Sequence, residues 1–341
     1  MSEAELAIAV TGANGFLGRE IVRQLHARGD AVIAITRKPD RDFQRAGIEN
    51  RLADLRDSVA MLAACNGAIS VIHTAAIAGI WGPWKHYFET NTLGTRNVIA
   101  ACRQHKISRM VFSSSPSVTF AAMDQINLSE GAPYATKWLC HYPHTKAIAE
   151  QEVLAANGDG GLWTCALRPH LIWGPGDQHL IPRLIERARQ GKLVQVGDGR
   201  NLIDTIYIEN AAEAHLLAMD RLTPGSPVCG KAYFLSQGEP VNCWQWIGEI
   251  LGLAGLRPPA KKISFKTAWR VGAVLEFLHL VVRSPREPRM TRFLAAQLAK
   301  SHNFDISAAR RDLGYSPKIT SAEGMRRLGT WLSEQHIGNG H

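Results

Sequence analysis

Tyr142 and Lys146 stand four residues apart at the head of a helical pattern that continues Ala-Ile-Ala-Glu-Gln. This spacing places both side chains on one face of a helix. A nearby ammonium group favours the phenolate and lowers the pKa of a phenol toward neutrality, which suits general acid–base chemistry at a carbonyl. A second pair, Tyr134 and Lys137, is three residues apart and precedes no clear amphipathic helix. We therefore expect proton transfer at Tyr142, although a surface pair would have the same spacing.

A serine cluster, Ser113–Ser115, ends the apolar segment that begins at Arg109. Doubly wound sheets bind their ligands at the carboxyl ends of strands. A hydroxyl group at such an end can donate to a carbonyl oxygen as negative charge builds on it. We expect Ser115 to have this role, with Ser114 as the second choice. The alternative is that the serines simply end a strand.

The glycines at 12, 15 and 18 follow the first apolar segment and open a helical pattern. A helix N-terminus offers free N–H groups and partial positive charge, which suit a pyrophosphate. The spacing G-x-x-G-x-x-G differs from the G-x-G-x-x-G dinucleotide fingerprint, but its place between a strand and a helix favours the same use. The residues expected at the cofactor here are Gly12, Asn14, Gly15, Phe16, Leu17 and Gly18.

The second apolar segment ends in Thr36, Arg37 and Lys38. An NAD site usually has an acidic residue here for the ribose 2′-hydroxyl, whereas Arg37 and Lys38 suit a 2′-phosphate. We therefore expect NADP(H), with NAD(H) as the alternative. If both cations are only solvated, this preference has no basis.

Short apolar segments alternate with helical patterns through the first half of the chain. This alternation predicts an α/β fold, a Rossmann-like doubly wound parallel sheet with a smaller, mainly helical C-terminal substrate lobe. We assign 1–175 to the cofactor domain, to which 203–236 returns. The substrate lobe is 176–202 and 237–337.

The composition is that of an ordinary globular protein of 341 residues, with 45% hydrophobic and 20% charged residues and a net charge of +9. The charge favours anionic small ligands, and no motif indicates a nucleic acid. The six cysteines are scattered, which predicts reduced thiols and no metal site. The first five residues lack the basic segment of a secretory signal, so a cytoplasmic enzyme is expected.

Four segments together resemble the extended short-chain dehydrogenases/reductases, in particular the 3β-hydroxysteroid dehydrogenase branch, over essentially the whole chain. They are TGANGFLG, the serine cluster, YPHTK and LRPHLIWGPGD. Longer segments, among them TKAIAEQEVLAAN and ALRPHLIWGPGDQHLIPRLIERARQGKL, resemble bacterial reductases of 2-alkyl-3-oxoalkanoates. The resemblance implies a catalytic set of Ser115, Tyr142 and Lys146, with Lys146 also binding the nicotinamide ribose.

Other roles come from the resemblance alone. It places Asp54 and Leu55 beside the adenine, and Ala75 and Ala76 along the cofactor. Asn91 corresponds to an asparagine that shapes a helix near the active site. Pro169 and Ile172 are expected beside the nicotinamide. The chain departs from the family pattern in the residues just before Tyr142, which are Trp-Leu-Cys-His.

The substrate is expected to be hydrophobic. Trp81 and Trp84 follow the fourth apolar segment and offer large apolar faces, although both could instead pack between lobes. His170 and Arg183, with Arg187, are candidates for binding a carboxylate. The apolar segment 268–282 predicts a lobe helix, or an interfacial helix that contacts lipid or a pathway enzyme.

These observations predict the reduction of a ketone, and the expected substrate is a 2-alkyl-3-oxoalkanoate. The alternatives are a 3β-hydroxysteroid or sterol dehydrogenase and, from another class, a sugar-nucleotide epimerase or dehydratase. A non-catalytic cofactor-binding protein fits the Ser–Tyr–Lys set poorly. By analogy of fold, we expect a homodimer.

Overall fold

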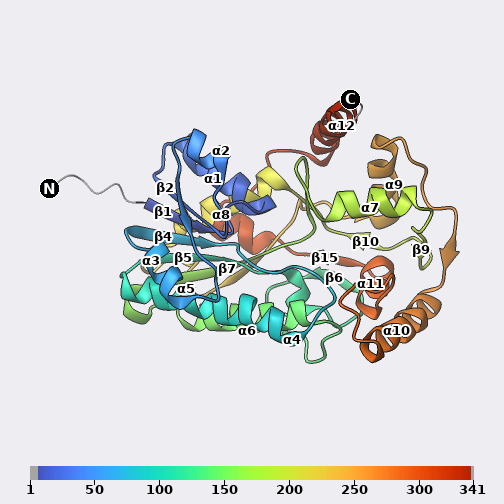
Figure 1. The fold of residues 1–341 in the computed structure, drawn as a ribbon, viewed down its shortest axis with the longest axis horizontal. Helices are drawn as coiled ribbons and strands as arrows, with labels where there is room; N and C mark the ends of the chain where they lie inside the picture. The colour runs from blue at the N-terminus through green and yellow to red at the C-terminus, as the bar shows by residue number, and fades with distance from the viewer. Residues whose placement is uncertain (1–6, 339–341) are drawn as a thin grey trace.

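The computed structural model describes residues 7–338, and the side chains as far as residue 335. The amino-terminal residues used for the secretory-signal prediction lie outside this range. A seven-stranded sheet with only parallel pairings forms the larger part of the molecule (Figure 1). Its strands, in spatial order, are β12 (Ala232–Leu235), β7 (Trp163–Pro169), β5 (Arg109–Ser113), β4 (Ala68–His73), β1 (Ala7–Thr11), β2 (Val32–Thr36) and β3 (Glu49–Leu52). The fold is the predicted Rossmann-like one, and its strand order changes direction between β1 and β4.

Helices cover both faces of this sheet, as the nearly continuous apolar strands require. One face packs against α1 (Phe16–Arg28) and α8 (Ile208–Arg221), and α2 (Arg41–Arg45) lies beyond them. The other face packs against α3 (Ser58–Ala64), α5 (Gly94–Gln104) and α6 (His141–Ala155). Because β12 and α8 belong to this assembly, the chain returns to the sheet after leaving it.

The second lobe has its own apolar core and lies at the right of Figure 1. Its helices are α7 (Leu180–Arg189), α9 (Cys243–Leu253), α10 (Phe265–Val281), α11 (Arg292–Ala299) and α12 (Ser321–Gly338). A four-stranded sheet joins β13 (Val241–Asn242), β10 (Leu202–Ile203), β15 (His302–Phe304) and β6 (Gln125–Leu128). Two small pairs complete it: β8 (Ile172–Trp173) with β11 (Ile206–Tyr207), and β9 (Gln195–Val196) with β14 (Lys262–Ile263).

The helical pattern predicted at 87–105 is a continuous helical segment that contains a π-helical turn. It consists of α4 (Trp84–Tyr87), a π-helical turn η1 (Phe88–Leu93) and α5. Short 3₁₀ turns follow β5 (η2, Pro116–Thr119) and α6 (η3, Asp159–Gly161), and a second π turn is η4 (Ala309–Leu313). A π turn inside a helix often marks a functional site, and η1 contacts α6, which carries Tyr142.

Candidate active site

Tyr142 and Ser115 line one pocket of about 200 Å³. Tyr142 lies in the first turn of α6, which begins at His141, and Ser115 follows the carboxyl end of β5. Pro169, at the end of β7, lines the same pocket. Three residues predicted from distant parts of the sequence are therefore brought together at the carboxyl edge of the sheet, where ligands of such folds bind.

The Ser115 hydroxyl is held by the turn that follows it. Its Oγ accepts a hydrogen bond from the Ser117 backbone N–H at 3.3 Å and lies 2.8 Å from Ser117 Oγ. Ser117 also lines the pocket. The second choice, Ser114, is buried, and its Oγ has no hydrogen-bond partner among the described residues. The structure thus favours Ser115 over Ser114 as the serine that faces a ligand.

Lys146 is buried, with 2% of its surface exposed. Its Nζ donates to the Ser113 carbonyl oxygen at 2.6 Å and lies 4.0 Å from the centre of the Phe112 ring. Burial lowers the pKa of Lys146 to about 7. The amine can therefore gain and lose a proton near neutral pH, although no carboxylate is paired with it among the described ion pairs.

The pKa of Tyr142 differs from the sequence-based prediction. Burial raises it, and the Ser115 hydroxyl opposes this in part. The prediction that Lys146 lowers the pKa of Tyr142 is not supported here, because Lys146 Nζ is directed to Ser113. Tyr142 is therefore a phenol at neutral pH, the form that donates a proton.

Asn91 ties the π turn η1 to both sides of the site. Its Nδ2 donates to the Ile77 carbonyl oxygen at 3.1 Å and to Thr145 Oγ1 at 3.2 Å, and its Oδ1 accepts from the Ile77 N–H at 2.8 Å. Thr92 Oγ1 donates to the Thr145 carbonyl oxygen at 3.1 Å. Asn91 thus holds the loop after β4 against the first turn of α6. It is a positioning residue for the site.

The competing tyrosine, Tyr134, has a structural role. Its Oη donates to Glu150 Oε1 at 2.7 Å, and Glu150 forms a buried ion pair with Arg168. Burial is the main cause that raises the pKa of Tyr134. The Tyr134 hydroxyl thus bonds a carboxylate outside the pocket of Tyr142. This agrees with the sequence analysis, which preferred Tyr142 as the proton donor.

The glycine loop packs closely against neighbouring backbone and leads directly into the N-terminus of α1. Gly12 has a φ of +66°, and a Cβ there would lie 2.8 Å from the Ala75 Cα. A Cβ on Gly18 would lie 2.1 Å from the Gly12 carbonyl oxygen. Gly15 caps α1 without any side-chain bond, so the first N–H groups of α1 are not capped by a side chain. These features fit a dinucleotide pyrophosphate at the N-terminus of α1.

The other loop residues have mixed environments. Asn14 is exposed, whereas Phe16 and Leu17 are half-buried and pack against the core of the second lobe. Asn14, Gly15 and Phe16 line a groove of about 190 Å³. Ala76 is exposed beside Ala75. Ile172 lies in β8 and is not among the described residues that line the pocket of Tyr142.

Arg37 and Lys38 are both exposed at the end of β2. Asp54 lies close enough for Arg37 to lower its pKa, but its main partner is Arg56, whose guanidinium donates to it at 2.8–2.9 Å and brings the pKa of Asp54 to about 2. Leu55 is buried. Asp54 therefore remains an ionised carboxylate that pairs with Arg56, while no ion pair of Arg37 or Lys38 is found among the described residues.

The substrate candidates separate into two groups. His170 lines the pocket with Ser115 and Tyr142. Trp81, Trp84 and Arg183 are not among the described lining residues. Trp81 Nε1 donates to the Ser284 carbonyl oxygen at 3.2 Å, Trp84 packs on Phe88, His141 and His144, and Arg183 and Arg187 pair with Glu287.

Several pocket residues carried no signal in the sequence. They come from η2, β6, α11 and β15, far apart in the chain, and no local motif points to them. They are Phe120, Gln125, Phe293, Gln297, His302 and Phe304. Among the described residues that line this pocket there is no Asp, Glu, Lys or Arg.

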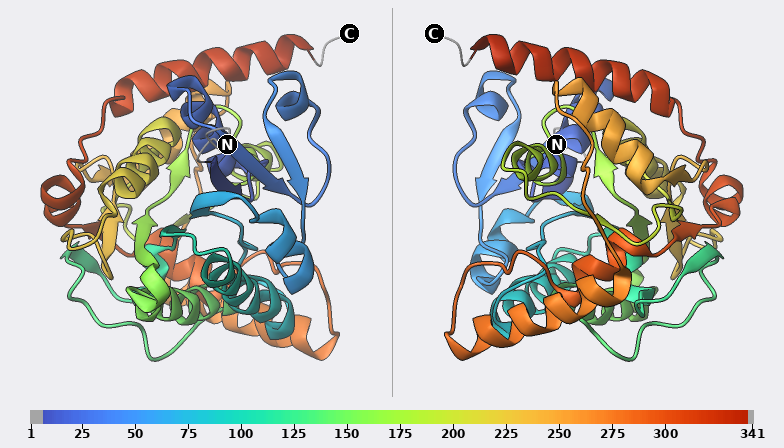
Figure 2. Two further views of the ribbon diagram at one scale, coloured as in Figure 1. Left: turned by 90° about the vertical axis from the view of Figure 1, so that its left-hand side faces the viewer. Right: turned by 90° about the vertical axis from the view of Figure 1, so that its right-hand side faces the viewer.

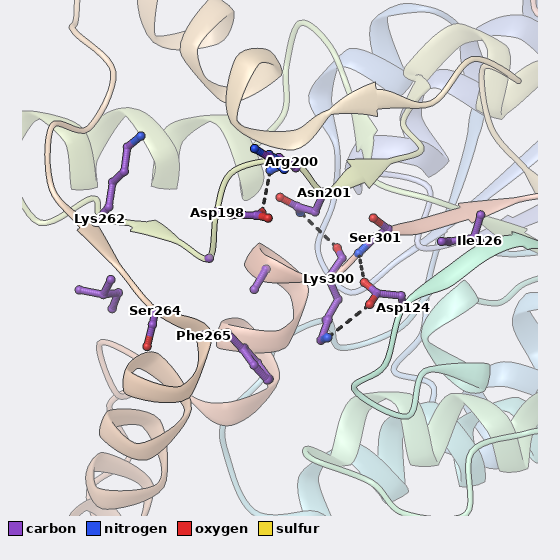
Figure 3. Close-up of a pocket in the computed structure, with 13 residues that line it drawn as sticks. Asp124, Ile126, Asp198, Arg200, Asn201, Lys262, Ser264, Phe265, Lys300 and Ser301 are labelled. Atoms are coloured by element: carbon purple, nitrogen blue, oxygen red, sulfur yellow. Dashed lines mark hydrogen bonds and ion pairs between the residues drawn. The ribbon is translucent and has the colours of Figure 1, made fainter.

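A larger open hollow, of about 750 Å³, lies elsewhere in the second lobe (Figure 3). Asp198, Lys262 and Phe265 line it on one side, and Asp124 and Lys300 pair across another part of its wall at 3.3 Å. None of the predicted catalytic or cofactor residues lines it. The chemistry therefore lies in the smaller pocket.

Comparison with known proteins agrees with this geometry. Residues 9–266 match the sequence pattern of the 3-beta hydroxysteroid dehydrogenase/isomerase family. The chain belongs to this family. It is an oxidoreductase acting on hydroxyl or keto groups, with the NAD(P)-binding Rossmann fold of the extended short-chain dehydrogenases.

Two relatives and one solved structure give finer likenesses. The chain is 49% identical to the 2-alkyl-3-oxoalkanoate reductase of Stenotrophomonas maltophilia (strain K279a), covering 95% of this chain and 98% of that protein. It is 33% identical to the human sterol-4-alpha-carboxylate 3-dehydrogenase, decarboxylating, over 96% of this chain and 88% of that one. The structure of MoeE5 in complex with UDP-glucose and NAD matches with a TM-score of 0.75 at 26% identity, over 97% of this chain and 99% of that chain.

Proposed function

We propose that this enzyme reduces the ketone of a 2-alkyl-3-oxoalkanoate to a secondary alcohol with NADP(H), reversibly. The observation that carries the proposal is that Tyr142 and Ser115 line one small pocket at the carboxyl edge of the sheet, with no Asp, Glu, Lys or Arg among its described lining residues. Such a pocket suits an uncharged carbonyl group surrounded by apolar substituents.

When bound, a nicotinamide nucleotide supplies the hydride. Tyr142 holds a proton on Oη, because burial raises its pKa, and donates it to the carbonyl oxygen. The Ser115 hydroxyl donates a hydrogen bond to the same oxygen as negative charge develops there. Lys146, whose pKa is about 7, holds or releases a proton at Nζ behind the strand end.

The substrate class is supported by what the names of the two relatives share. A 2-alkyl-3-oxoalkanoate and a sterol-4-alpha-carboxylate acted on at carbon 3 both place an oxygen function on the carbon beta to a carboxylate. Both also branch at the alpha carbon. The higher identity to the first relative favours an open-chain acid. A sterol-type 3-hydroxy acid is the second candidate.

The preference for NADP(H) rests on Arg37 and Lys38, exposed at the end of β2. The carboxylates nearby are occupied: Asp40 caps α2 and pairs with Arg19, and Asp54 pairs with Arg56. Neither Arg37 nor Lys38 forms an ion pair with a carboxylate among the described residues, which supports a site for a 2′-phosphate.

The deciding experiment is a spectrophotometric assay of the purified protein. Because β-keto acids lose CO₂ readily, the reverse reaction is measured too, with a 2-alkyl-3-hydroxyalkanoate and NADP⁺ or NAD⁺. A 3β-hydroxysteroid, a sterol-4-carboxylate and UDP-glucose are tested in parallel. We expect the highest kcat/KM for the open-chain hydroxy acid with NADP⁺. A higher value for the steroid or the UDP-sugar would refute the substrate assignment.

A further inference from the structure

Two buried histidines face each other in the pocket of Tyr142. His170 follows β7 with 8% of its surface exposed, and His302 begins β15 with 2% exposed. His170 Nε2 lies 2.6 Å from His302 Nδ1, and the rings are perpendicular, with centroids 4.7 Å apart. Both line the pocket. No local sequence pattern pairs them, since they are 132 positions apart.

The hydrogen bonds of this pair fix its protons. His302 Nε2 lies 3.0 Å from the Gln297 carbonyl oxygen, which can only accept, so His302 Nε2 carries a proton. In a neutral His302 the Nδ1 is then bare and accepts from His170 Nε2. A neutral His170 has only its Nδ1 left, as an acceptor. His170 Nδ1 has no hydrogen-bond partner among residues 7–338.

A carboxylate cannot bond to a bare nitrogen, because both groups only accept. If His170 Nδ1 gains a proton, the pair becomes a donor with one positive charge. Since no Asp, Glu, Lys or Arg is among the described lining residues, the histidines are the groups able to supply that charge inside the pocket. Burying an anion there without it would be costly.

We propose that His170 and His302 form the carboxylate subsite of the substrate pocket, and that binding the substrate anion takes up one proton onto the pair. This inference rests on the proposed function and names the part of the site that recognises the substrate carboxylate. His170 and His302 are specificity residues that bind and orient the carboxylate, while Tyr142 and Ser115 act on the carbonyl oxygen.

The surroundings of the pair leave this proton exchange available. Burial lowers the pKa of both histidines, so the pair is neutral without an anion at pH 7. Aromatic rings pack against it, Phe304 on His170 and Phe120 on His302. The titratable and charged groups nearby are Tyr142 across the pocket, Asp124 paired with Lys300 at the surface, buried Asp204 bonded to the Phe304 N–H, and Lys146 at Ser113.

The test compares a 2-alkyl-3-hydroxyalkanoate with its methyl ester at pH 6 to 9. For the wild-type enzyme we expect the kcat/KM ratio of acid to ester to fall about tenfold per pH unit above the apparent pKa of the pair, because one proton is taken up. Calorimetry of acid binding to the cofactor-loaded enzyme, in buffers of different ionisation enthalpy, should show about one proton taken up. A flat ratio together with no proton uptake would overturn the subsite.

Variants give a second reading. His170→Gln and His302→Gln should each lower the acid-to-ester ratio at pH 6.5 at least tenfold and flatten its pH dependence. The matched control is His105→Gln, since His105 Nε2 also lies near one carbonyl oxygen, that of Leu62, but far from the pocket. Cofactor binding and thermal unfolding verify that each variant folds. Unchanged acid-to-ester ratios in folded variants contradict the proposal. A wild-type enzyme that is inactive on both the acid and the ester contradicts the proposed function instead.

A second inference comes from the surface of α10. Apolar residues usually face inward, but here a row spaced three or four apart faces outward. Val271, Val274, Leu278 and Val281 are 43–63% exposed, and Phe277 beside them is 65% exposed. Ala268, Gly272 and Glu276 form the buried side. Figures 1 and 2 place α10 along the outer edge of the second lobe.

Cations border this apolar row at both ends. Lys261, Lys262, Lys266 and Arg270 precede or begin it, and Arg283, Arg286 and Arg289 follow it; all seven are exposed. The two acids of 261–292 are occupied: Glu276 is buried and pairs with Arg292, and Glu287 pairs with Arg183. The apolar row from Val271 to Val281, about 15 Å long at 1.5 Å per residue, thus lies between two groups of cations.

We propose that α10 lies in the surface of an anionic lipid bilayer, with its apolar row among the acyl chains and the cations at the headgroups. No helix of residues 7–338 is long and apolar enough to cross a membrane, so the helix lies along the surface. Its neighbour α11 supplies Phe293 and Gln297 to the substrate pocket. The pocket, of about 200 Å³, is small for long alkyl chains. In this arrangement the part of a chain that does not fit the pocket extends into the apolar part of the bilayer.

Sedimentation with vesicles tests this. The wild-type protein should sediment with phosphatidylglycerol vesicles at low salt, and much less with pure phosphatidylcholine or at 0.5 M salt. Val274→Ser/Phe277→Ser should reduce bound protein at least fivefold. Leu52→Ser/Val59→Ser is the matched control, because Leu52 and Val59 are also exposed apolar residues, at the β3 edge of the seven-stranded sheet, and this variant should bind like wild type. Equal binding by both double variants would overturn the proposal. So would an α10 variant that changes the oligomeric state instead, since it would identify a second copy as the occupant.

Discussion

At the scale of single residues, burial sets the protonation state of the catalytic groups more than pairing does. Tyr142 is held as a phenol, and the pKa of Lys146 is lowered to about 7, although the two share one face of α6. The ammonium is compensated by the Ser113 carbonyl oxygen and the Phe112 ring rather than by a carboxylate. The resting enzyme is thus arranged to donate a proton, as a reductase requires.

Tyr142→Phe should remove the proton donor without disturbing the fold. We expect kcat to fall at least about 100-fold, within the range that a positioned general acid contributes. Binding of NADPH, followed by fluorescence titration, should change little. Tyr134→Phe is the matched control, since its hydroxyl bonds Glu150 outside the pocket. It should keep kcat and lose about 1 kcal/mol of stability. A Tyr142→Phe enzyme with wild-type turnover would exclude the mechanism.

Lys146 should make stability depend on pH with a defined sign. Its pKa is about 7 when folded and ordinary, near 10.5, when unfolded. Between these values the unfolded chain binds more protons, so the contribution of Lys146 to the unfolding free energy rises with pH, by at most about 1.4 kcal/mol per unit. The difference between wild type and Lys146→Met, from urea unfolding at pH 7, 8 and 9, should grow in favour of wild type. Exposed Lys106→Met should give a constant difference.

At the scale of elements, local patterns identify what local sequence determines. The glycine loop, the strand ending in serines and the i, i+4 pair each lie within about ten residues, and they lie where the sequence places them. The π turn η1 was not predicted, and its Asn91 bonds Ile77 and Thr145, which only the folded chain brings together. His302 and Phe293 were missed for the same reason. Their place in the pocket is decided by packing between lobes, which no local pattern reports.

Gly18→Ala tests how closely α1 must approach the glycine loop. The new Cβ would lie 2.1 Å from the Gly12 carbonyl oxygen, and backbone cannot yield as a side chain does. We expect a loss of about 1–3 kcal/mol and weaker cofactor binding. Gly252→Ala in α9 is the matched control, because its Cβ would meet nothing within 4 Å. It should gain about 0.5–1 kcal/mol. Similar changes in the two unfolding free energies would contradict the close-approach argument.

At the scale of the whole molecule, the cofactor loop joins the two lobes. Leu17, just after Gly15, packs against a core cluster of the sheet and against the core of the second lobe, and Ile172 does the same. The substrate pocket likewise takes Tyr142 from one part and His302 from the other. We therefore expect the lobes to unfold together, and a ligand bound at the loop to stabilise both.

The last prediction uses this coupling to decide the cofactor. NADPH at 100 times its Kd should stabilise the protein by about 2.7 kcal/mol, and the midpoints followed by circular dichroism and by tryptophan fluorescence should shift together. In Arg37→Ala/Lys38→Ala the affinity for NADPH should fall at least tenfold, so its stabilisation at the same concentration should shrink, while that by NADH should persist. In the proposed site, these cations pair with the 2′-phosphate that distinguishes the two nucleotides. If the affinities for NADPH and NADH fall equally in the double variant, Arg37 and Lys38 supply general electrostatic attraction and NAD(H) becomes the better assignment. If the two probes separate, the lobes are not coupled through the loop.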